Sequence, residues 1–323
     1  MTCMTVPIEW VRLQGLGLPL GYFGVVDLYR AFRAGADPMA TLYARTHPHP
    51  DMAGRIAELG ELCTHPLTID PPLPVVLTAR GHYELLDGHH RACRALVDGW
   101  THIPVHVTSV SPNWQRLVED LAAIYPERPY PLYQPIEHPF FDSWRVDRGA
   151  ERLRTVFDAL TTAGVTPSAG PYMEIGSCTG RFTREAARRG WLTFGLEQDQ
   201  HVLRIAEYLG LVFGLHVTYY NRGDPDRWLE EVVTPMGVIL CLSVFHRYIH
   251  AGQHEWVRTL YQRCIAQSRA FVVDCGSPHE AALQPSPVPL DVAGFTAWLQ
   301  AIAGTKVVRP IGETEGRVIY LVA

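Results

Sequence analysis

Short apolar runs alternate with helical patterns through the second half of the chain. Strands are predicted from Tyr172, at Trp191–Leu196, Val217–Tyr220, Gly237–Leu242 and Phe271–Asp274, and in a final pair at Lys306–Pro310 and Arg317–Val322. Helices are predicted at His254–Gln267 and Asp291–Ile302, and the polar turn Gly312–Gly316 joins the last two strands. Because strand and helix alternate and end in a hairpin, the pattern predicts a seven-stranded, mostly parallel α/β sheet with one reversed strand.

A different pattern, typical of an α+β domain, occupies residues 71–107. Two apolar runs, Val75–Leu77 and Tyr83–Leu86, flank the turn Ala79-Arg80-Gly81 and predict a hairpin. A short helix should follow, with Ala92, Ala95 and Leu96 as its buried stripe and Gly99 as its end, and then a strand at Ile103–Val107.

The segment between these patterns is rich in proline and aromatic residues and shows little periodicity that would support a helix. Because aromatic side chains are costly to leave in water, we expect this segment to pack against one or both domains. The sequence thus predicts a domain at 1–110, a connector at 111–148 and a second domain at 149–323.

Composition limits the classes of protein to consider. With 323 residues, 47 % hydrophobic and 19 % charged, the chain has material for two cores. A net charge of −5 gives no overall attraction to nucleic acid, although 28 basic residues could make a local patch. Seven scattered cysteines without C-x-x-C spacing, and no apolar run near the roughly 18 residues that span a bilayer, favour a cytoplasmic protein without membrane association.

The stretch YMEIGSCTGRFT, Tyr172–Thr183, carries the clearest chemical signal. Gly176 allows a tight turn after the strand, and Gly180 allows the next helix to approach closely. The free N–H groups of that helix suit an anionic or strongly polar ligand. Since the spacing differs from G-x-G-x-x-G, a pyrophosphate is not the first expectation.

Two acids follow neighbouring strands. Glu197 comes about two dozen residues after Glu174, where doubly wound folds place a carboxylate that accepts both ribose hydroxyls. Alone, Glu174 would be a strand-end capping acid and Glu197 a solvated charge. Their occurrence in register with two strand-helix units favours a nucleoside site.

In these features the chain resembles the class I S-adenosylmethionine-dependent methyltransferases, over Glu151–Ala323. The resemblance implies a Rossmann-like sheet that binds S-adenosylmethionine. It also implies these cofactor-binding residues: Glu174, Gly176, Ser177 and Gly180 at the methionine moiety, Glu197 at the ribose, Gln198 and Asp224 at the adenine, and Ser243 beside the methyl donor. For Asp224, an ordinary Asp-Pro turn is the alternative.

Candidate catalytic groups follow the fourth strand in SVFHRYIH, where the resemblance places residues that orient or deprotonate the acceptor. His246 is the first candidate for a base and Tyr248 a second group, with packing as the alternative role. Cys178 is interpreted as a small packing residue, because direct methyl displacement needs no covalent intermediate. The histidine pairs, including His246/His250, have no HExxH or cysteine partners, so no protein metal site is predicted.

In the first half, Asp87-Gly88-His89-His90-Arg91 opens the short helix, so backbone N–H groups, the helix dipole and Arg91 converge on one anion site. The segment resembles the ParB/sulfiredoxin-like fold, over Val6–Val107, in the form found in its free-serine-kinase branch. This implies that Gly88–Arg91 hold the phosphates of ATP, ADP or another nucleotide, that Asp87 helps with Mg²⁺ or acts as a base, and that Glu9 is the early candidate for a catalytic glutamate base. A plain turn with Asp87 capping the helix is the alternative.

Together these features predict a methyltransferase that acts on an O or N nucleophile of a small molecule. The absence of a D/N-P-P-Y/F motif after the fourth strand disfavours methylation of DNA bases. Two alternatives remain: a nucleotide-gated module that recruits nucleic acid or a protein, and a bifunctional small-molecule kinase-methyltransferase. The sequence does not indicate the oligomeric state.

Overall fold

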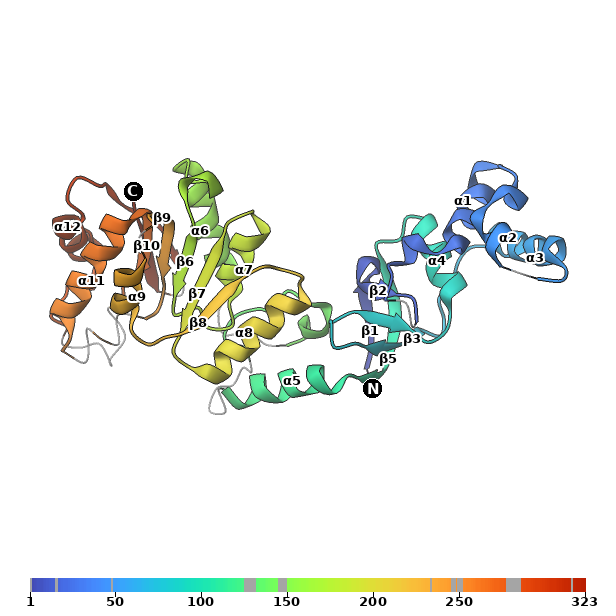
Figure 1. Ribbon diagram of the computed structural model, residues 1–323, viewed down its shortest axis with the longest axis horizontal. Coiled ribbons are helices and arrows are strands. Elements are labelled where there is room, and N and C mark those ends of the chain that lie inside the picture. Colours follow the sequence, from blue (N-terminus) through green and yellow to red (C-terminus); the bar gives the residue numbers. More distant parts are fainter. Residues whose placement is uncertain are drawn as a thin grey trace. The chain divides into compact units, whose positions relative to one another are not determined.

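The computed structural model (Figure 1) describes residues 2–14, 17–47, 49–124, 132–144, 150–232, 234–244, 248, 252–276, 286–314 and 316–323. The chain forms two compact units, and each is discontinuous in sequence. The first comprises Met1–Glu119 and Glu137–Asp142, and the second comprises Asp120–Ile136 and Ser143–Ala323.

The first unit is built on a five-stranded mixed sheet in the order β1-β5-β3-β4-β2. Its strands are β1 Thr2–Pro7, β2 Val11–Arg12, β3 Leu73–Leu77, β4 Tyr83–Leu85 and β5 His102–Val110. Its helices are α1 Gly24–Ala34, α2 Leu42–Thr46, α3 Met52–Thr64 and α4 His89–Val97, with short 3₁₀ turns η1 Ile8–Trp10, η2 Leu20–Tyr22, η3 Pro38–Ala40 and η4 Pro139–Phe141. The antiparallel pairing of β3 with β4 confirms the predicted hairpin.

A helix, α5 Pro112–Ile124, begins the segment for which we expected little helix. The expectation was wrong because it averaged composition over residues 111–148, whereas the prolines become dense only after Ile124. Within α5, Trp114, Leu117 and Leu121 are all buried. Their i, i+3, i+7 spacing is that of one helix face.

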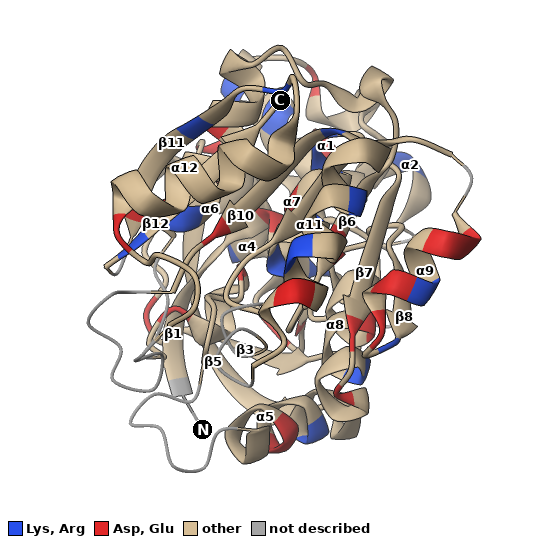
Figure 2. Ribbon diagram, turned by 90° about the vertical axis from the view of Figure 1, so that its left-hand side faces the viewer, with Lys and Arg blue, Asp and Glu red and all other residues tan. Residues whose placement is uncertain are grey.

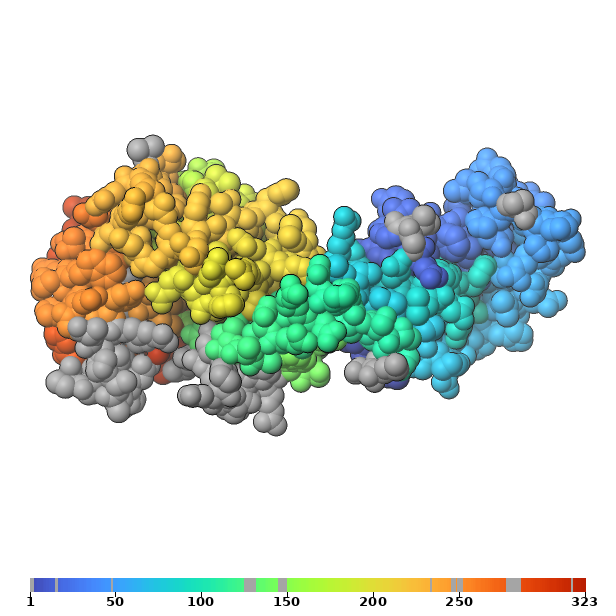
Figure 3. Space-filling view, turned by 60° about the horizontal axis from the view of Figure 1, so that its bottom comes forward, coloured from blue at the N-terminus to red at the C-terminus, as the bar shows by residue number. Residues whose placement is uncertain are grey.

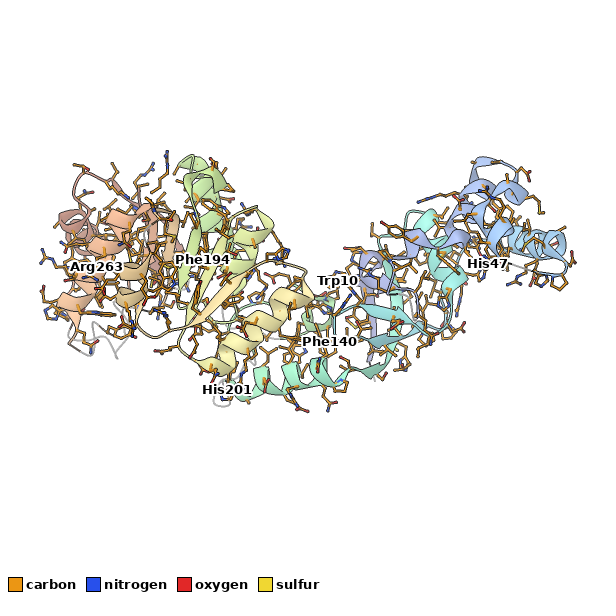
Figure 4. All side chains as sticks on the ribbon, in the orientation of Figure 1. Trp10, His47, Phe140, Phe194, His201 and Arg263 are labelled. Carbon is orange, nitrogen blue, oxygen red and sulfur yellow. The ribbon has the colours of Figure 1, made fainter. Side chains whose placement is uncertain are left out.

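Farther along the connector, residues 137–142 belong to the first unit. His138 is fully buried, its Nε2 lies 2.6 Å from the Gly81 carbonyl oxygen, and its Nδ1 accepts from the Phe140 N–H at 3.1 Å. Its ring lies among Trp10, Tyr83 and Trp114, and Figure 4 labels Trp10 and Phe140. Burial lowers the pKa of His138 to about 4, so the neutral ring fills this aromatic cage.

The second unit is built on a seven-stranded sheet in the order β11-β12-β10-β9-β6-β7-β8. Its strands are β6 Tyr172–Ile175, β7 Thr193–Glu197, β8 Thr218–Asn221, β9 Met236–Cys241, β10 Ser268–Asp274, β11 Val308–Thr314 and β12 Arg317–Val322. Its helices are α6 Glu151–Thr162, α7 Arg181–Arg188, α8 Gln200–Val212, α9 Pro225–Glu231, α11 His254–Gln267 and α12 Val292–Ala303, with the 3₁₀ turn η5 Pro167–Ala169. β12 alone runs in the direction opposite to the other six strands, which confirms the predicted reversed strand.

Helices cover both faces of this sheet, so alternate strand residues are buried on opposite sides. Met173 and Ile175 pack in one core with α9, α11 and α12, whereas Tyr172 packs in a second core with α6 and α7. Figure 1 labels these helices around the sheet. Phe194, labelled in Figure 4, lies on β7. In Figure 3 the yellow α8 and the orange α11 form part of the outer surface.

Charged side chains pair on the outside of α9 and α11. Arg263 of α11 lies 3.3 Å from Asp226 and 3.0 Å from Glu230 of α9, and Figure 2 shows both signs of charge along these helices.

At one edge of the sheet, strand β11 continues to Thr314, so the turn that we predicted at Gly312–Gly316 was placed to begin too early. The polar residues that suggested a turn lie on a largely exposed edge strand, which can carry them.

Candidate functional site

The site is positioned by a reversal in the order of the strands. From β6 the chain crosses to β7 and β8 on one side, and it then returns to β9 on the other side. Crevices outside the carboxyl ends of strands at such a switch point are where open α/β sheets bind ligands. The loops after β6, β7, β8 and β9 carry the residues that the sequence singled out.

The loop after β6 is a tight turn that depends on glycine. Gly176 has a φ of +74° and Gly180 a φ of +77°, and Cys178 between them also has a positive φ, of +51°. A Cβ on Gly176 would lie 2.3 Å from Val244 Cγ2, so this turn approaches the loop after β9 very closely. The turn therefore leaves backbone, rather than side chains, at the switch point.

Glu197 at the end of β7 is tied to the same turn. Its Oε2 accepts from the Cys178 N–H at 2.9 Å and its Oε1 accepts from the Asp199 N–H at 3.0 Å. A carboxylate has about four acceptor positions, so roughly two remain for a ligand. Two acceptors on one rigidly held group match the two adjacent hydroxyls of a ribose.

Glu174 has a structural role in the site. It is buried, and its Oε2 accepts from the Thr183 N–H at 2.9 Å and from the Thr183 hydroxyl at 2.5 Å, which joins β6 to the first turn of α7. Burial raises its pKa to about 8, although the donors of Thr183 and the charge of Arg184 lower it. Glu174 thus positions the glycine turn through α7.

This pKa predicts how stability depends on pH. The folded unit keeps the Glu174 proton up to about pH 8, whereas the unfolded chain releases it near its ordinary value of 4.5, so stability should fall as pH rises between these values. In Glu174→Gln the loss between pH 5 and 8 should shrink by on the order of 2–4 kcal/mol. Urea unfolding at pH 5 and at pH 8, for the wild type and for Glu174→Gln, measures this loss of stability. The same slope in Glu174→Gln as in wild type would contradict it, and Glu207→Gln, an exposed change on α8, is the control.

Gly180 lies directly beneath a tyrosine of β8. A Cβ at this position would lie 2.0 Å from the Tyr219 hydroxyl oxygen and 2.8 Å from its Cζ. Ser177, fully buried, lies nearby, with its Oγ 3.0 Å from the Cβ position of Gly195. Hence the turn and Tyr219 are packed as one layer beside the site.

Gly180→Ala should lower the free energy of unfolding by about 2–4 kcal/mol, because it combines a left-handed backbone position with a displaced ring. Gly164→Ala is the matched control, since Gly164 also has a positive φ but nothing within 4 Å of its Cβ position. In a Tyr219→Ala background the cost should fall to about that of the control, about 1 kcal/mol. Equal costs for Gly180→Ala and Gly164→Ala in the native background, measured by urea unfolding, would contradict this packing.

The predicted adenine side of the site is formed by the loops after β7 and β8. Asn221 Nδ2 donates to the carbonyl oxygens of Glu197 and Gln198, at 3.2 and 3.0 Å. Gln198 is exposed, and its Oε1 lies 3.4 Å from the Cβ position of Gly223. Asp224 accepts from the Arg227 N–H at 3.3 Å as the N-cap of α9, which is the turn role given above as its alternative. Sequence reasoning missed Asn221, whose only signal was its place at the end of β8.

Beyond β9, Ser243 belongs to a buried polar cluster that the sequence did not reveal. Its N–H donates to Asp274 Oδ1 at 2.7 Å, and its hydroxyl lies 3.2 Å from Asp274 Oδ2. Arg152 Nη2 donates to Ser243 Oγ at 2.9 Å and also to Asp274 Oδ2. Arg317 Nη1 lies 3.9 Å from the same Asp274 oxygen.

Of the two predicted catalytic residues that follow β9, the structure describes only Tyr248. His246, like His250, lies outside the described residues. Tyr248 packs its ring against Trp256 of α11, with centroids 4.9 Å apart, and borders the core of the second unit. Cys178 is buried, in keeping with its interpretation as a packing residue.

In the first unit, the predicted phosphate site lies where α4 begins. Gly88, with φ of +81°, is the N-cap and no side chain caps the helix. Asp87 Oδ1 accepts from the Gly88 N–H at 2.6 Å, so Asp87 does not act as the helix cap. The Arg91 guanidinium lies over this turn, 3.2 Å from the Cβ position of Gly88.

An aromatic and histidine cluster surrounds the same helix end. His47, labelled in Figure 4, stacks on Tyr43 at 4.4 Å, and Phe23 contacts both His47 and His89. His90 Nδ1 lies 3.3 Å from the buried Tyr29 hydroxyl, and burial, followed by the charge of Arg55, lowers the pKa of His90. The cluster thus brings His47 to the pair His89 and His90.

Glu9, the early candidate for a catalytic glutamate base, is exposed on η1 near Arg12. Within the described part of the chain, no hydrogen bond, ion pair or ring contact joins it to residues 87–91. Across the same residues, no group of three or more His, Cys, Asp or Glu side chains is arranged to hold a metal ion. None of the described helices is both long and apolar enough to cross a bilayer.

Comparison with known proteins finds no matching family model and no matching curated protein. Among solved structures, the bifunctional kinase-methyltransferase WbdD matches with a TM-score of 0.50 and 21 % identity, over 63 % of this chain and 46 % of that chain. Magnesium protoporphyrin IX methyltransferase of Synechocystis PCC 6803, with bound SAM, gives a TM-score of 0.40 and 13 % identity, over 53 % of this chain and 77 % of that chain. The match to WbdD spans less than half of the length of that protein. The likeness to WbdD, together with the strand order, shows that the chain contains a Rossmann-like α/β fold.

Proposed function

We propose that the second unit binds S-adenosylmethionine and transfers its methyl group to an O or N nucleophile of a small molecule. The observation that carries this proposal is Glu197, a carboxylate held by two backbone N–H groups at the end of β7, with acceptor positions left over. The left-handed glycines at 176 and 180 fit the same ligand, because they keep the turn free of side chains; a Cβ at these positions would displace Val244 and Tyr219, respectively. The fold likeness to methyltransferases agrees with this assignment.

The cofactor supplies an electrophilic methyl group on a sulfonium, and the chain supplies position. Glu197 would accept from the two ribose hydroxyls, while Gln198 and Asn221 border the base. Val244 lies so close to Gly176 that no side chain fits at this position of the turn, which leaves the backbone exposed to the switch point. In-line displacement then depends mainly on alignment and on desolvation of the acceptor. His246 remains the predicted base and Tyr248 a positioning group.

Calorimetry with S-adenosylhomocysteine tests the proposal directly on the full chain. We expect saturable binding and a rise in the melting temperature, since a ligand that binds only the native state stabilises it by mass action. 5′-Methylthioadenosine, which lacks the amino-acid part, should bind more weakly than S-adenosylhomocysteine. Absence of both heat and thermal shift with either compound would refute the assignment.

For the first unit we propose that the start of α4 binds the phosphates of a nucleotide such as ATP or ADP. The uncapped N–H groups of this helix, the Arg91 guanidinium and the rings around His47 and His89 favour an anion joined to a flat base. Asp87 is exposed beside this turn, so its carboxylate is the group that would hold Mg²⁺. The ParB/sulfiredoxin-like relationship stays a prediction.

Nucleotide binding is tested with ADP, with and without Mg²⁺. Arg91→Gln should weaken it at least tenfold, whereas Arg80→Gln, an exposed arginine of the hairpin turn, should not. Equal affinities for the two variants would place the nucleotide elsewhere. Release of ADP from ATP with a small hydroxylated substrate would favour the kinase-methyltransferase version. Salt-sensitive binding to nucleic acid without turnover would favour the recruiting module.

A further inference from the structure

We propose that Arg152 forms an anion subsite for the methyl acceptor, so that the acceptor of this protein carries a carboxylate or phosphate group. The inference deepens the proposed function of the second unit and rests on it. It starts from the buried cluster of Arg152, Ser243, Asp274 and Arg317, which we call the β9–β10 polar cluster.

Four elements bring this cluster to the carboxyl edge of the sheet. Arg152 lies in the first turn of α6, Ser243 follows β9, Asp274 ends β10, and Arg317 begins the reversed strand β12. The Arg152 side chain is 5 % exposed and the Asp274 side chain 2 %. A charged group of this size is rarely buried unless it has partners for its hydrogen-bond donors.

The donors of Arg152 are only partly used. A guanidinium has five N–H donors, and the bonds to Ser243 and Asp274 both come from Nη2. Nε is buried and has no hydrogen-bond partner. Because buried polar groups in native proteins almost always have partners, the vacant donor on a planar cation points to an acceptor that arrives with a ligand.

The charge of the cluster agrees with an anionic ligand. Asp274 accepts from Arg152 and from the Ser243 N–H, and it also lies near Arg317, so its charge is shared. Arg152 can therefore interact with a second anion without losing its bond to Asp274. Carboxylates and phosphates match the fork of N–H groups that a guanidinium presents.

The position of the cluster in the sheet indicates which ligand group can reach Arg152. Glu197 ends β7, whereas Asp274 ends β10, three strands away across the switch point, or about 14 Å at the usual strand spacing. With the ribose at Glu197, a ligand group at Arg152 lies beyond the reactive end of the cofactor. Two carboxylate or phosphate sources can reach that side: the acceptor, which we favour, and the methionyl carboxylate of the cofactor.

The test uses the full chain labelled with ¹⁵N-arginine and loaded with S-adenosylhomocysteine. The Nε–H resonance of Arg152 is assigned by its loss in Arg152→Lys. Inorganic phosphate is then titrated, and we expect a saturable shift of this resonance. In Arg152→Gln the affinity for phosphate should fall at least tenfold. Arg154→Gln, on the same helix but with a side chain 71 % exposed, should leave it unchanged.

Two outcomes would overturn the proposal. If phosphate gives no saturable shift at Arg152, the residue is a structural partner of Asp274 only. If Arg152→Gln weakens S-adenosylhomocysteine at least tenfold but leaves 5′-methylthioadenosine unaffected, the subsite belongs to the cofactor and not to the acceptor. Should Arg152→Gln fail to fold, the double variant Arg152→Gln/Asp274→Asn is used in its place, because it removes both charges of the buried pair. Failure of the wild type to bind S-adenosylhomocysteine would reject the proposed function instead, and the phosphate titration of the ligand-free chain would still test Arg152.

Discussion

Glu197→Ala is expected to weaken the binding of S-adenosylhomocysteine by at least a hundredfold and to abolish its thermal stabilisation of the protein. The carboxylate would accept two hydrogen bonds from the ribose, and each bond to a charged group is worth about 1.5–3 kcal/mol. Their sum corresponds to roughly 10²- to 10⁴-fold in affinity. The change also releases the N–H groups of Cys178 and Asp199, which loosens the turn that faces the ligand.

Calorimetry and melting curves with and without the ligand measure this effect. Glu207→Ala, an exposed change on α8, controls for the loss of one negative charge in the same unit. Glu197→Gln removes the charge but keeps one of the two backbone contacts, since its single amide oxygen can still accept from one N–H group but pairs less strongly with the ribose. An unchanged affinity in Glu197→Ala would remove this residue from the ribose contact.

Asp274→Ala is expected to lower the free energy of unfolding by about 3–5 kcal/mol, because it leaves the Arg152 guanidinium buried without its anion. The same carboxylate holds the Ser243 N–H at 2.7 Å, so the loop after β9 should lose its anchor as well. Ser243 itself has a φ of +59°, a conformation that such an anchor helps to maintain.

Urea unfolding of the full chain, followed by a signal from the second unit, measures the loss. Asp158→Ala, at an exposed position of α6, is the control and should change the free energy of unfolding by less than about 0.5 kcal/mol. Combining Asp274→Ala with Arg152→Met should recover much of the stability, because a buried pair replaced by apolar groups costs far less than a broken pair. A loss below about 1 kcal/mol in the single variant would show that water reaches and compensates Arg152.

The sheet of the second unit could be predicted because strand and helix alternate with clear apolar runs. The same reasoning failed for α5 and for the end of β11, since composition hid the helix period in the first and an exposed edge allowed polar residues in the second. It also gave no hint that Arg181 and Arg184 of α7 are buried. Arg184 donates to the Thr179 carbonyl and lies over Phe213, partners that a charge pattern cannot reveal.

The candidate site shows the same division. The glycine turn and Glu197 were found because they lie in one continuous pattern of strand, turn and helix. The β9–β10 polar cluster was not found, because Arg152 and Asp274 are 122 residues apart and each alone resembles a surface charge. For Asp224 the sequence allowed both a ligand contact and a turn, and the structure shows the helix cap.

The aromatic cage around His138 determines where the protein can be cut. Residues 137–142 belong to the first unit although 120–136 belong to the second, so the polypeptide passes between the units three times. A fragment that stops at residue 119 would leave Trp10, Tyr83 and Trp114 without the ring that fills the space between them. Such a fragment should aggregate on expression, whereas a fragment that continues through residue 142 should keep the His138 ring in its place.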